Sequence, residues 1–364
     1  MAEEVKQPAR LPDATHHVVV KLETIHVPVP EIDTAGMTHE VIGYEYTPPS
    51  DNGLAAARVR PASVLITTTV PISAATLGEA PYLKCIITET TGTNHIDLDE
   101  CKRRGITVMY SPLATVEAVS EHAIGLYFST RRRLVKLHNT MMDHSPSHDN
   151  PWRATGSMSS LLLDAEGRPP HTCGNEVAGL IGYGPIGQRV AGLCRALGME
   201  VLVAERKGAS SPTSTTLPGD AHDMPARTPF PEVLRRATTL FLIVPLTPDT
   251  KYLIGKAELA TMRPDVVIVN VGRGGTVDEA ALLEALKPGR IAGAATDVYE
   301  VEPAGSGRDS VLLGDEARDL NLTLTPHLAW CADQTRVNIR RVVGENLKAF
   351  VRGEKVDNVV LDMR

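Results

Sequence analysis

The sequence predicts an α/β protein of two domains, in which a doubly wound parallel sheet is inserted into a smaller α/β domain. Three observations support this fold class. The chain has 364 residues, a length that favours two domains over one. Short apolar runs alternate with helical stretches, which is typical of parallel sheets. A glycine-rich turn joins one central strand to the helix that follows it.

The first third of the chain supplies the strands of the smaller domain. Apolar runs bounded by turn residues predict strands at 17–22, 41–46, 64–69, 83–88 and 106–110. From Val116 onward the apolar residues recur at helical spacing as far as Leu137, which predicts one long helix that leaves this domain. The basic run at 131–133 lies inside this pattern, and we expect it to form a solvated face of the helix.

A second α/β block follows. Strands are expected at 177–181, 200–204, 240–245, 266–271, 291–297 and 322–325, with a helix at 278–286 and an amphipathic stretch at 332–350. We therefore expect the inserted domain to span residues 118–331. The smaller domain would comprise residues 1–117, and a C-terminal helix and tail at 332–364 would return to it.

Residues 139–172 are rich in Ser, Pro, His, Asp and Gly, which predicts a long loop that has a function or packs on a partner. His144 and His148 have a spacing that a metal could use on a helix, but Pro146 between them opposes a helix. We therefore expect no metal site.

Composition argues against several classes of protein. Lys and Arg number 37 against 44 Asp and Glu, a net charge of −7, so a nucleic-acid partner is not expected. No run of 18 apolar residues is present, and no membrane partner is expected. The five cysteines form no C-x-x-C pair, and the first residues contain no secretory segment. These features indicate reduced thiols and a cytoplasmic protein.

The strongest local signal is a G-x-G-x-x-G turn between the strand at 177–181 and an amphipathic helix. It consists of Gly182, Tyr183, Gly184, Pro185, Ile186 and Gly187. Its glycines permit a tight turn and a close approach of the backbone to a pyrophosphate at the helix N-terminus. An ordinary strand-to-helix turn is the alternative. Placed between strand and helix, the motif predicts a Rossmann dinucleotide-binding domain.

Glu205 lies 18 residues beyond Gly187, at the end of the next predicted strand. A carboxylate there accepts hydrogen bonds from ribose hydroxyls and repels a 2′-phosphate, which favours NAD. Arg206 and Lys207 follow directly, and a guanidinium could instead pair with that phosphate, so NADP stays open. A surface glutamate without a cofactor role is the other reading.

Three side chains with reactive or charged groups follow predicted strands of the inserted domain. Arg273 follows the strand at 266–271, Glu302 the strand at 291–297, and His327 the strand at 322–325. The carboxyl ends of parallel strands carry ligand-contacting residues, so the three can converge on one crevice. Hydride addition to a ketone places negative charge on oxygen, which a cation and a proton donor stabilise. Taken alone, each residue could be a solvated surface group.

These segments resemble the D-isomer-specific 2-hydroxyacid dehydrogenases over residues 61–360. The matching pieces are TGTNHID at 91–97, the glycine turn, VPLTPDT at 244–250, NVGRGGTVDEAAL at 270–282, DVYEVEP at 297–303 and TPHLAW at 325–330. TPHLAW, followed by a helix that ends in ENLKAFVRGE, is most similar to the hydroxypyruvate and glyoxylate reductase (glycerate dehydrogenase) branch. The resemblance implies a flavodoxin-like substrate domain around the inserted NAD-binding domain, and a homodimer.

The resemblance also implies a role for each matching residue. Arg273 would bind the carboxylate and carbonyl oxygen of a small 2-oxo acid, His327 would act as general acid and base, and Glu302 would hydrogen-bond His327. Further substrate contacts would come from Thr91, Gly92, Thr93 and Trp330. Further cofactor contacts would come from Val244, Pro245, Thr250, Val271, Gly272 and Asp297, beside the glycine turn, Glu205 and Arg206.

Departures from relatives narrow the expected substrate. Relatives that oxidise formate carry glutamine in place of Glu302, and phosphoglycerate-oxidising relatives use arginines where this chain has Thr67, Thr68 and Thr69. Neither substrate is therefore expected. Residues 139–172 and 208–231 look longer than is usual in the family. A dehydrogenase-like corepressor that senses NAD(H) and an inactive scaffold are the competing readings.

Overall fold

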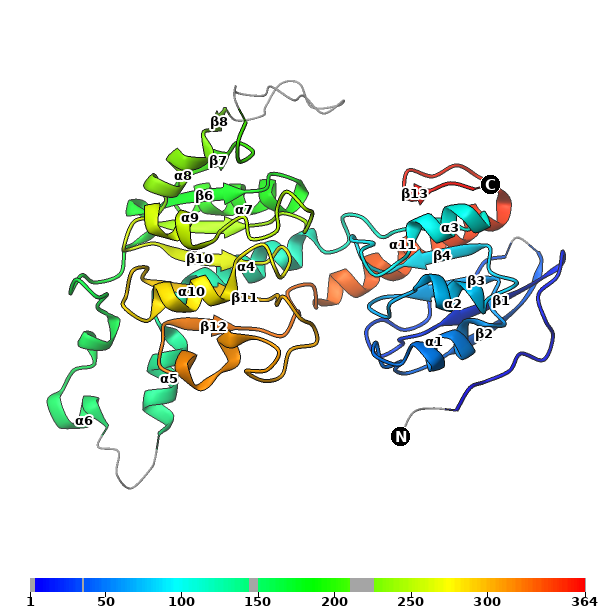
Figure 1. Cartoon of the computed structure of the whole chain (residues 1–364), viewed down its shortest axis with the longest axis horizontal. Coiled ribbons are helices and arrows are strands. Elements are labelled where there is room, and N and C mark those ends of the chain that lie inside the picture. Colours follow the sequence, from blue (N-terminus) through cyan, green and yellow to red (C-terminus); the bar gives the residue numbers. More distant parts are fainter. Residues whose placement is uncertain (1–3, 35, 144–149, 210–225, 364) are drawn as a thin grey trace. The chain divides into compact units, whose positions relative to one another are not determined.

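The structure is a computed structural model that describes residues 4–34, 36–143, 150–209 and 226–363 (Figure 1). The chain divides into two compact units. The larger unit spans residues 116–330, and the smaller unit comprises residues 1–115 and 331–364. Each unit is built on a sheet of its own.

The larger unit contains a parallel sheet with the strand order β12-β11-β10-β9-β6-β7-β8. Its described strands are β6 (Val177–Ile181), β7 (Glu200–Ala204), β8 (Arg227–Thr228), β9 (Thr239–Leu242), β10 (Val267–Asn270), β11 (Gly293–Thr296) and β12 (Leu322–Leu324). The chain runs outward from β6 through β7 to β8, then returns to the other side of β6 at β9. This reversal is the switch point of a doubly wound sheet, where such folds bind ligands. The Rossmann fold predicted for this part of the chain is confirmed.

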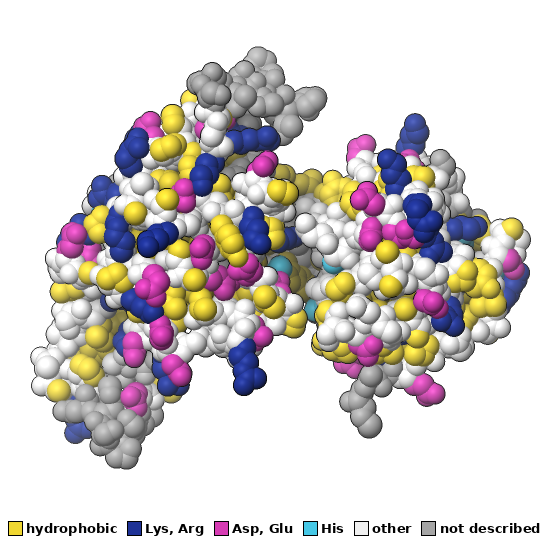
Figure 2. Space-filling view, viewed as in Figure 1, with side chains coloured by type: hydrophobic (Ala, Val, Ile, Leu, Met, Phe, Trp, Pro, Cys, Tyr) yellow, Lys and Arg dark blue, Asp and Glu magenta, His cyan; other side chains and the backbone are white. Residues whose placement is uncertain are grey.

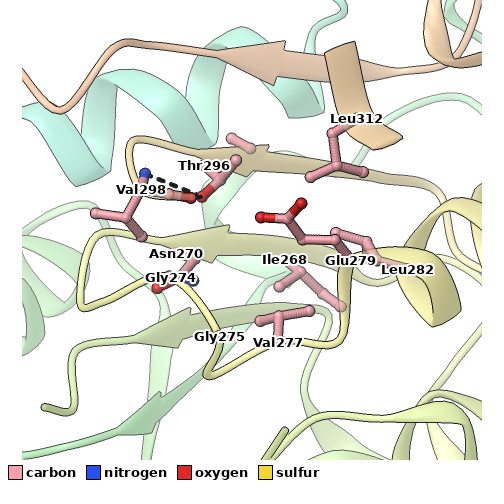
Figure 3. A pocket seen from close by; sticks show the side chains of 11 residues that line it. Ile268, Asn270, Gly274, Gly275, Val277, Glu279, Leu282, Thr296, Val298 and Leu312 are labelled. Carbon is pink, nitrogen blue, oxygen red and sulfur yellow. Dashed lines mark hydrogen bonds between the residues drawn. The ribbon is translucent and has the colours of Figure 1, made fainter. Parts of the chain in front are cut away.

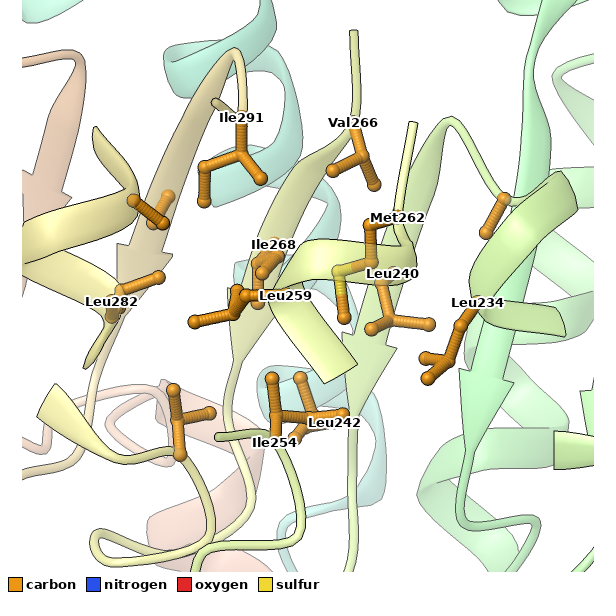
Figure 4. Close-up of a cluster of buried hydrophobic side chains, with 14 of the residues drawn as sticks. Leu234, Leu240, Leu242, Ile254, Leu259, Met262, Val266, Ile268, Leu282 and Ile291 are labelled. Carbon is orange, nitrogen blue, oxygen red and sulfur yellow. The ribbon is translucent and has the colours of Figure 1, made fainter. Parts of the chain in front are cut away.

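Helices cover both faces of this sheet. On one face α8 (Phe230–Arg236), α9 (Lys256–Thr261) and α10 (Glu279–Leu286) share an aliphatic core with the strands, seen around Leu240 and Ile268 in Figure 4. On the other face α4 (Val116–Arg131) and α7 (Pro185–Ala196) pack against side chains such as Phe241. Leu240 and Phe241 enter opposite cores because successive residues of a strand point to opposite faces. The two cores fix the strands, so their carboxyl ends present the loops at one rigid edge.

The single long helix predicted from Val116 is wrong, because the structure has two helices there. α4 ends at Arg131, and α5 (Leu134–Met142) begins after Arg133, whose φ of 48° lies in the left-handed region. A left-handed residue interrupts a right-handed helix. The loop predicted at 139–172 contains the short helix α6 (Pro151–Thr155) and a 3₁₀ turn at Ser159–Leu162, and a second 3₁₀ turn at Cys173–Asn175 follows it. His144, Pro146 and His148 lie outside the described residues, as does most of 208–231.

The expectation of a solvated basic face is wrong for Arg131. This residue is 5% exposed, and its Nε lies 2.6 Å from Oε1 of the buried Glu176. Its guanidinium also donates to the carbonyl oxygens of Asp265 and Thr238, at 2.8 and 2.6 Å. Glu176 and Thr238 directly precede β6 and β9, and Asp265 lies two residues before β10, so Arg131 ties α4 to the amino-terminal edge of the sheet. Its neighbour Arg132 is exposed, as expected.

The smaller unit contains a second sheet, with the strand order β13-β5-β4-β3-β1-β2. Its described elements are β1 (His16–Lys21), β2 (Thr38–Gly43), α1 (Asn52–Val59), β3 (Val64–Thr67), α2 (Ala74–Gly78), β4 (Cys85–Thr88), α3 (Leu98–Arg104), β5 (Thr107–Met109), α11 (Asp333–Arg352) and β13 (Val359–Leu361). Only β13 among these strands pairs antiparallel. The order β2-β1-β3-β4-β5 is that of flavodoxin-like folds, as predicted.

The second strand of this unit was predicted at 41–46 and lies at 38–43 instead. β2 is the edge of the sheet, and Thr38 and His39 on it are exposed. A half-exposed edge strand carries only a short apolar signal, here Val41 and Ile42, so its start could not be read from hydrophobicity.

Charges of both signs are mixed over the surface. Figure 2 shows Lys and Arg side chains interspersed with Asp and Glu on the described part of the visible face. This mixture agrees with the net charge of −7. Within the described ranges, every helix is too short or too polar to cross a membrane.

Candidate active site

The glycine turn lies at the switch point of the larger sheet. It follows β6, and Gly184 is the N-cap residue of α7. Gly182 has a φ of 101°, and a Cβ on it would lie 2.4 Å from the carbonyl oxygen of Ile243. Only glycine fits this turn, because a side chain would collide with the segment that follows β9. The loops after β6 and β9 are therefore packed directly against each other.

The start of α7 fits a pyrophosphate. No side chain in the described part of the chain caps this helix, so its first N–H groups have no side-chain acceptor. Gly184 is exposed, and beyond its own chain neighbours no described atom lies within 4 Å of the position that its Cβ would take. A helix terminus with open space and unsatisfied N–H groups stabilises an anion. The residues present thus fit the diphosphate of NAD or NADP.

The next two loops complete this edge of the sheet. After β9, the hydroxyl of Thr250 donates to the carbonyl oxygen of Pro245 at 2.7 Å, which closes the loop that starts at Val244. After β10, the buried Val271 leads to Gly272, where a Cβ would lie 2.7 Å from the carbonyl oxygen of Val244. The glycine turn after β6 and the loops after β9 and β10 are therefore neighbours. All three carry residues that were predicted to contact the cofactor.

Glu205 directly follows β7 and is half-buried. Its backbone N–H donates to the carbonyl oxygen of Thr228 at 2.8 Å, so β8 fixes its position. Of the two cations that follow it, Lys207 forms an ion pair with Glu258 at 2.8 Å, and Arg206 is exposed. One of the two candidate partners for a 2′-phosphate is thus already engaged by a carboxylate.

Arg273 lies in a turn whose backbone is clamped. The hydroxyl of Thr276 donates to the carbonyl oxygen of Arg273 at 2.7 Å, and Nδ2 of Asn270 approaches the same oxygen at 3.3 Å. The guanidinium donates to the carbonyl oxygen of Gly272 at 2.9 Å. Burial lowers the pKa of Arg273, and the charge of Glu302 opposes that shift. Arginine is a permanent cation, so a half-buried positive charge is available here.

Asn270 and Thr276 were missed by sequence reasoning. Short polar side chains on both sides of a G-R-G-G turn bond readily to nearby backbone, which was the available signal.

Gly274 brings the Arg273 turn against the loop that carries Glu302. A Cβ on Gly274 would lie 1.7 Å from the carbonyl oxygen of Tyr299, closer than any two unbonded atoms can come. The two backbones are therefore in direct contact, and Arg273 and Glu302 interact electrostatically.

His327 and Glu302 form a hydrogen-bonded pair. Nδ1 of His327 lies 2.6 Å from Oε2 of Glu302, and the other oxygen of Glu302 accepts the N–H of Tyr299 at 2.9 Å. Burial would raise the pKa of Glu302, but the hydrogen bond and charge of His327 outweigh it, with further help from Tyr299 and Arg273, and the pKa lies below its ordinary value. Glu302 is thus a carboxylate at neutral pH that accepts the Nδ1 proton. Nε2 is the ring nitrogen left for a substrate.

The loop of His327 depends on Asp297. His327 itself has a φ of 54°, and its N–H donates to the carbonyl oxygen of Asp297 at 2.8 Å. The Asp297 carboxylate, predicted to contact the cofactor, accepts hydrogen bonds from Thr325, Leu328 and Ala329. Trp330, a predicted substrate residue, is half-buried and packs against the core formed by α4 and α7.

A small cavity lies behind these loops (Figure 3). Glu279 at the start of α10 points into it, with Asn270, Gly274 and Thr296 among the other lining residues. The Glu279 carboxylate accepts the N–H of Glu300 at 2.8 Å and the hydroxyl of Ser310 at 2.5 Å. It therefore supports the loop that carries Glu302 from behind.

Thr91, Gly92 and Thr93 belong to the smaller unit, in the loop that follows β4. The hydroxyl of Thr90 donates to the carbonyl oxygen of Gly92 at 2.6 Å, and the N–H of Ile96 donates to that of Thr93 at 3.0 Å. The loop is therefore ordered by its own hydrogen bonds. Its shared role with Arg273 remains a prediction.

A doubly wound sheet whose carboxyl edge gathers a dinucleotide turn, a half-buried arginine and a His–Glu pair defines an oxidoreductase of the nicotinamide-dependent class. Comparison with known families narrows this class. The NAD binding domain of the D-isomer specific 2-hydroxyacid dehydrogenases matches residues 125–329, and the chain belongs to that family. It is therefore an oxidoreductase that acts on a CH–OH group with NAD or NADP, and the predicted family is confirmed.

Individual relatives agree with this placement. The chain is 34% identical to a glycerate dehydrogenase of Methylorubrum extorquens over 304 residues, covering 83% of this chain and 87% of the relative. It is 31% identical to a glyoxylate reductase of Aeropyrum pernix over 318 residues, covering 87% and 88%. Among solved structures, an NADPH-dependent glyoxylate/hydroxypyruvate reductase of Sinorhizobium meliloti, in complex with NADP and malonate, superposes with a TM-score of 0.71 at 26% identity, covering 95% of this chain and 97% of the other. A Thermus thermophilus protein gives a TM-score of 0.74 at 29% identity, covering 94% and 100%.

Proposed function

We propose that this enzyme reduces a small 2-oxo acid, of the glyoxylate or hydroxypyruvate kind, to the D-2-hydroxy acid, with NADH as the preferred reductant. The observation that carries the proposal is the His327–Glu302 hydrogen bond of 2.6 Å beside the half-buried charge of Arg273. The names of the relatives, glycerate dehydrogenase and glyoxylate reductase, support the choice of substrate.

The glycine turn at 182–187 would hold the dinucleotide, and when bound its nicotinamide would supply a hydride to the carbonyl carbon of the substrate. As the carbonyl oxygen gains charge, protonated His327 donates the proton on Nε2 to it, which gives the hydroxyl group. Glu302 accepts the Nδ1 proton throughout, so it orients the ring for this transfer. In the oxidative direction, neutral His327 takes the hydroxyl proton back.

Arg273 would bind the substrate carboxylate and the carbonyl oxygen. A guanidinium offers a permanent charge and parallel N–H donors that match a carboxylate. Its turn is held by Asn270 and Thr276, and Gly274 locks that turn against the Tyr299 backbone. A cation fixed in this way stabilises charge that develops during the reaction without reorganising. Thr91, Gly92 and Thr93 would contribute further contacts to the carboxylate.

A phosphorylated substrate is not favoured. Thr67, Thr68 and Thr69 stand where phosphoglycerate-oxidising relatives use arginines. The N–H groups of Thr68 and Thr69 donate to Glu23 at 2.9 and 2.7 Å. A loop wrapped around a carboxylate lacks the cations that a phosphate needs.

We further propose a cytoplasmic homodimer. The described cysteines are thiols rather than disulfides, which supports a reducing compartment. α5 has no buried residue in the described chain, and Leu134, Val135, Met141 and Met142 on it are at least 40% exposed. An exposed apolar helix face of this kind marks a protein–protein interface. We expect a second copy of this chain to bury it. Light scattering of the purified chain should give the mass of two copies, and Leu134→Glu with Met142→Glu should give the mass of one.

The activity is tested by following NADH absorbance with a panel of 2-oxo acids and both reduced cofactors. Addition of glyoxylate or hydroxypyruvate should lower the NADH absorbance. In the reverse assay, formate should not reduce NAD to NADH. If no member of the panel is reduced while NADH still binds, the chain is a nucleotide-sensing binding protein rather than this enzyme.

A further inference from the structure

His327 is held in an unfavourable backbone conformation. Its φ of 54° is rare for a residue with a side chain, and such strain persists only where the surroundings impose it. The strand β12 before it ends at Leu324, and the N–H of Thr325 still donates to the carbonyl oxygen of Thr296 at 3.1 Å, so regular sheet pairing does not reach residues 326–329. Another group must hold this loop in place.

Asp297 provides four contacts to this loop, three of them through its carboxylate. Asp297 follows β11 and is 1% exposed. Its Oδ1 accepts the hydroxyl of Thr325 at 2.6 Å and the N–H of Leu328 at 3.0 Å, and its Oδ2 accepts the N–H of Ala329 at 2.9 Å. Its own carbonyl oxygen accepts the N–H of His327 at 2.8 Å. Asp297 thus bonds to the loop on both sides of His327 and at His327 itself.

A second element braces the same contact. Nε2 of His122, on α4, lies 3.0 Å from the hydroxyl oxygen of Thr325 and 3.7 Å from Oδ1 of Asp297. Because α4 packs into the core on one face of the sheet, it ties Thr325 to a rigid part of the fold. The hydroxyl of Thr325 therefore joins β11, α4 and the His327 loop.

We propose that Asp297 is the positioning residue of this active site: its buried carboxylate fixes residues 325–329 and so holds the imidazole of His327 against Glu302. The inference rests on the proposed function, because it takes proton transfer by His327 as given. The family resemblance assigns Asp297 to the cofactor, whereas three of its carboxylate contacts are made to the loop. Misplacing a general acid slows the chemical step without weakening the binding of the cofactor.

Two substitutions test the proposal, because Asp297→Asn alone could fail to fold. Thr325→Val removes one hydroxyl that bonds to Asp297, and Thr325→Ser keeps it. The matched control is Thr323→Val, which removes a buried hydroxyl that bonds to Ser129 and Thr130 of α4 and not to the loop. For each variant, kcat and KM are measured with NADH and glyoxylate, and the Kd for NADH is measured by its fluorescence.

Asp297→Asn and Thr325→Val should each lower kcat about 100-fold, with the Kd for NADH within about twofold of the wild type. Thr325→Ser and Thr323→Val should keep kcat near the wild-type value. A wild-type kcat in Thr325→Val would overturn the proposal. So would an Asp297→Asn variant that binds NADH far more weakly yet keeps its kcat at saturating NADH, since that result makes Asp297 a cofactor residue.

The imidazole resonances of His327, assigned by their loss in His327→Ala, give a readout that needs no turnover. They should move in Thr325→Val and stay in Thr323→Val. If the wild type reduces no 2-oxo acid, the proposed function has failed, and these resonances alone decide the positioning role. Unmoved resonances in Thr325→Val would then refute it.

Discussion

Nδ1 of His327 lies 2.6 Å from Oε2 of Glu302, although 25 residues separate them in the chain. The second oxygen of Glu302 is held by the N–H of Tyr299, so the carboxylate cannot rotate freely. The pair joins the ends of β11 and β12. Its geometry allows a histidine to exchange a proton at Nε2 while Nδ1 stays bonded.

The lowered pKa of Glu302 predicts how stability depends on pH. Because folding lowers this pKa, the folded chain binds the proton more weakly than the unfolded chain. The ionised Glu302 carboxylate therefore stabilises the fold above pH 4.5, its ordinary pKa. This stabilisation is lost as pH falls through the lowered pKa of the folded chain. Between about pH 5.5 and about pH 3.5, the Tm of the wild type should fall more than that of Glu302→Gln.

The exposed Glu121→Gln on α4 is the matched control, and its Tm should follow the wild type over this range. Parallel curves for the wild type and Glu302→Gln would show that the ion pair does not stabilise the fold.

Glu205 should set the choice of cofactor. Its carboxylate at the end of β7 repels a 2′-phosphate, so the wild type should prefer NADH. Removing the charge in Glu205→Ser should lower the ratio of kcat/KM for NADH over NADPH about 10-fold, equivalent to about 1.4 kcal/mol. Steady-state kinetics with both cofactors measures the ratio. Arg206→Ala is the companion variant and should lower kcat/KM for NADPH. A wild type that prefers NADPH would contradict this role of Glu205.

Gly274→Ala should disrupt the site. The added methyl group would lie 1.7 Å from the carbonyl oxygen of Tyr299, so the turn of Arg273 must move. Overpacking of this kind costs about 1–3 kcal/mol or more, and both Tm and kcat should fall. In Gly192→Ala, on α7, the new methyl has no neighbour within 4 Å among the described residues, and Ala favours a helix. Its Tm should be equal to the wild type or higher; a Gly274→Ala enzyme with wild-type Tm would refute the close contact.

Arg131→Met should be among the most destabilising single changes in the larger unit. It leaves the carboxylate of Glu176 buried without its cation, and breaking a buried pair in this way costs about 3–5 kcal/mol. Arg132→Met, next to it and exposed, should cost less than about 0.5 kcal/mol. Urea unfolding of both variants measures the difference, and equal midpoints would show that the buried pair contributes little.

These cases show which features local sequence reveals. β6 and β7 lie at the predicted residues, because each is an apolar run closed by a sharp signal, Gly182 or Glu205. The position of Arg273, Glu302 and His327 at one edge followed from the rule for carboxyl ends of parallel strands. The burial of Arg131 could not be read, because helical spacing does not reveal that Glu176 lies 45 residues away in the chain. For the same reason, nothing local indicated that Asp297 bonds to Leu328 and Ala329.

The proton transfer by His327 and the substrate binding by Arg273 are tested most directly by His327→Ala and Arg273→Ala, with the exposed His39→Ala and Arg132→Ala as matched controls. Turnover of the 2-oxo acid is measured beside NADH affinity in the same preparations. Each of the two site variants should lose about 10³-fold in kcat/KM while the Kd for NADH changes less than about twofold, and the controls should retain full activity. Wild-type turnover in either His327→Ala or Arg273→Ala would contradict the proposed chemistry.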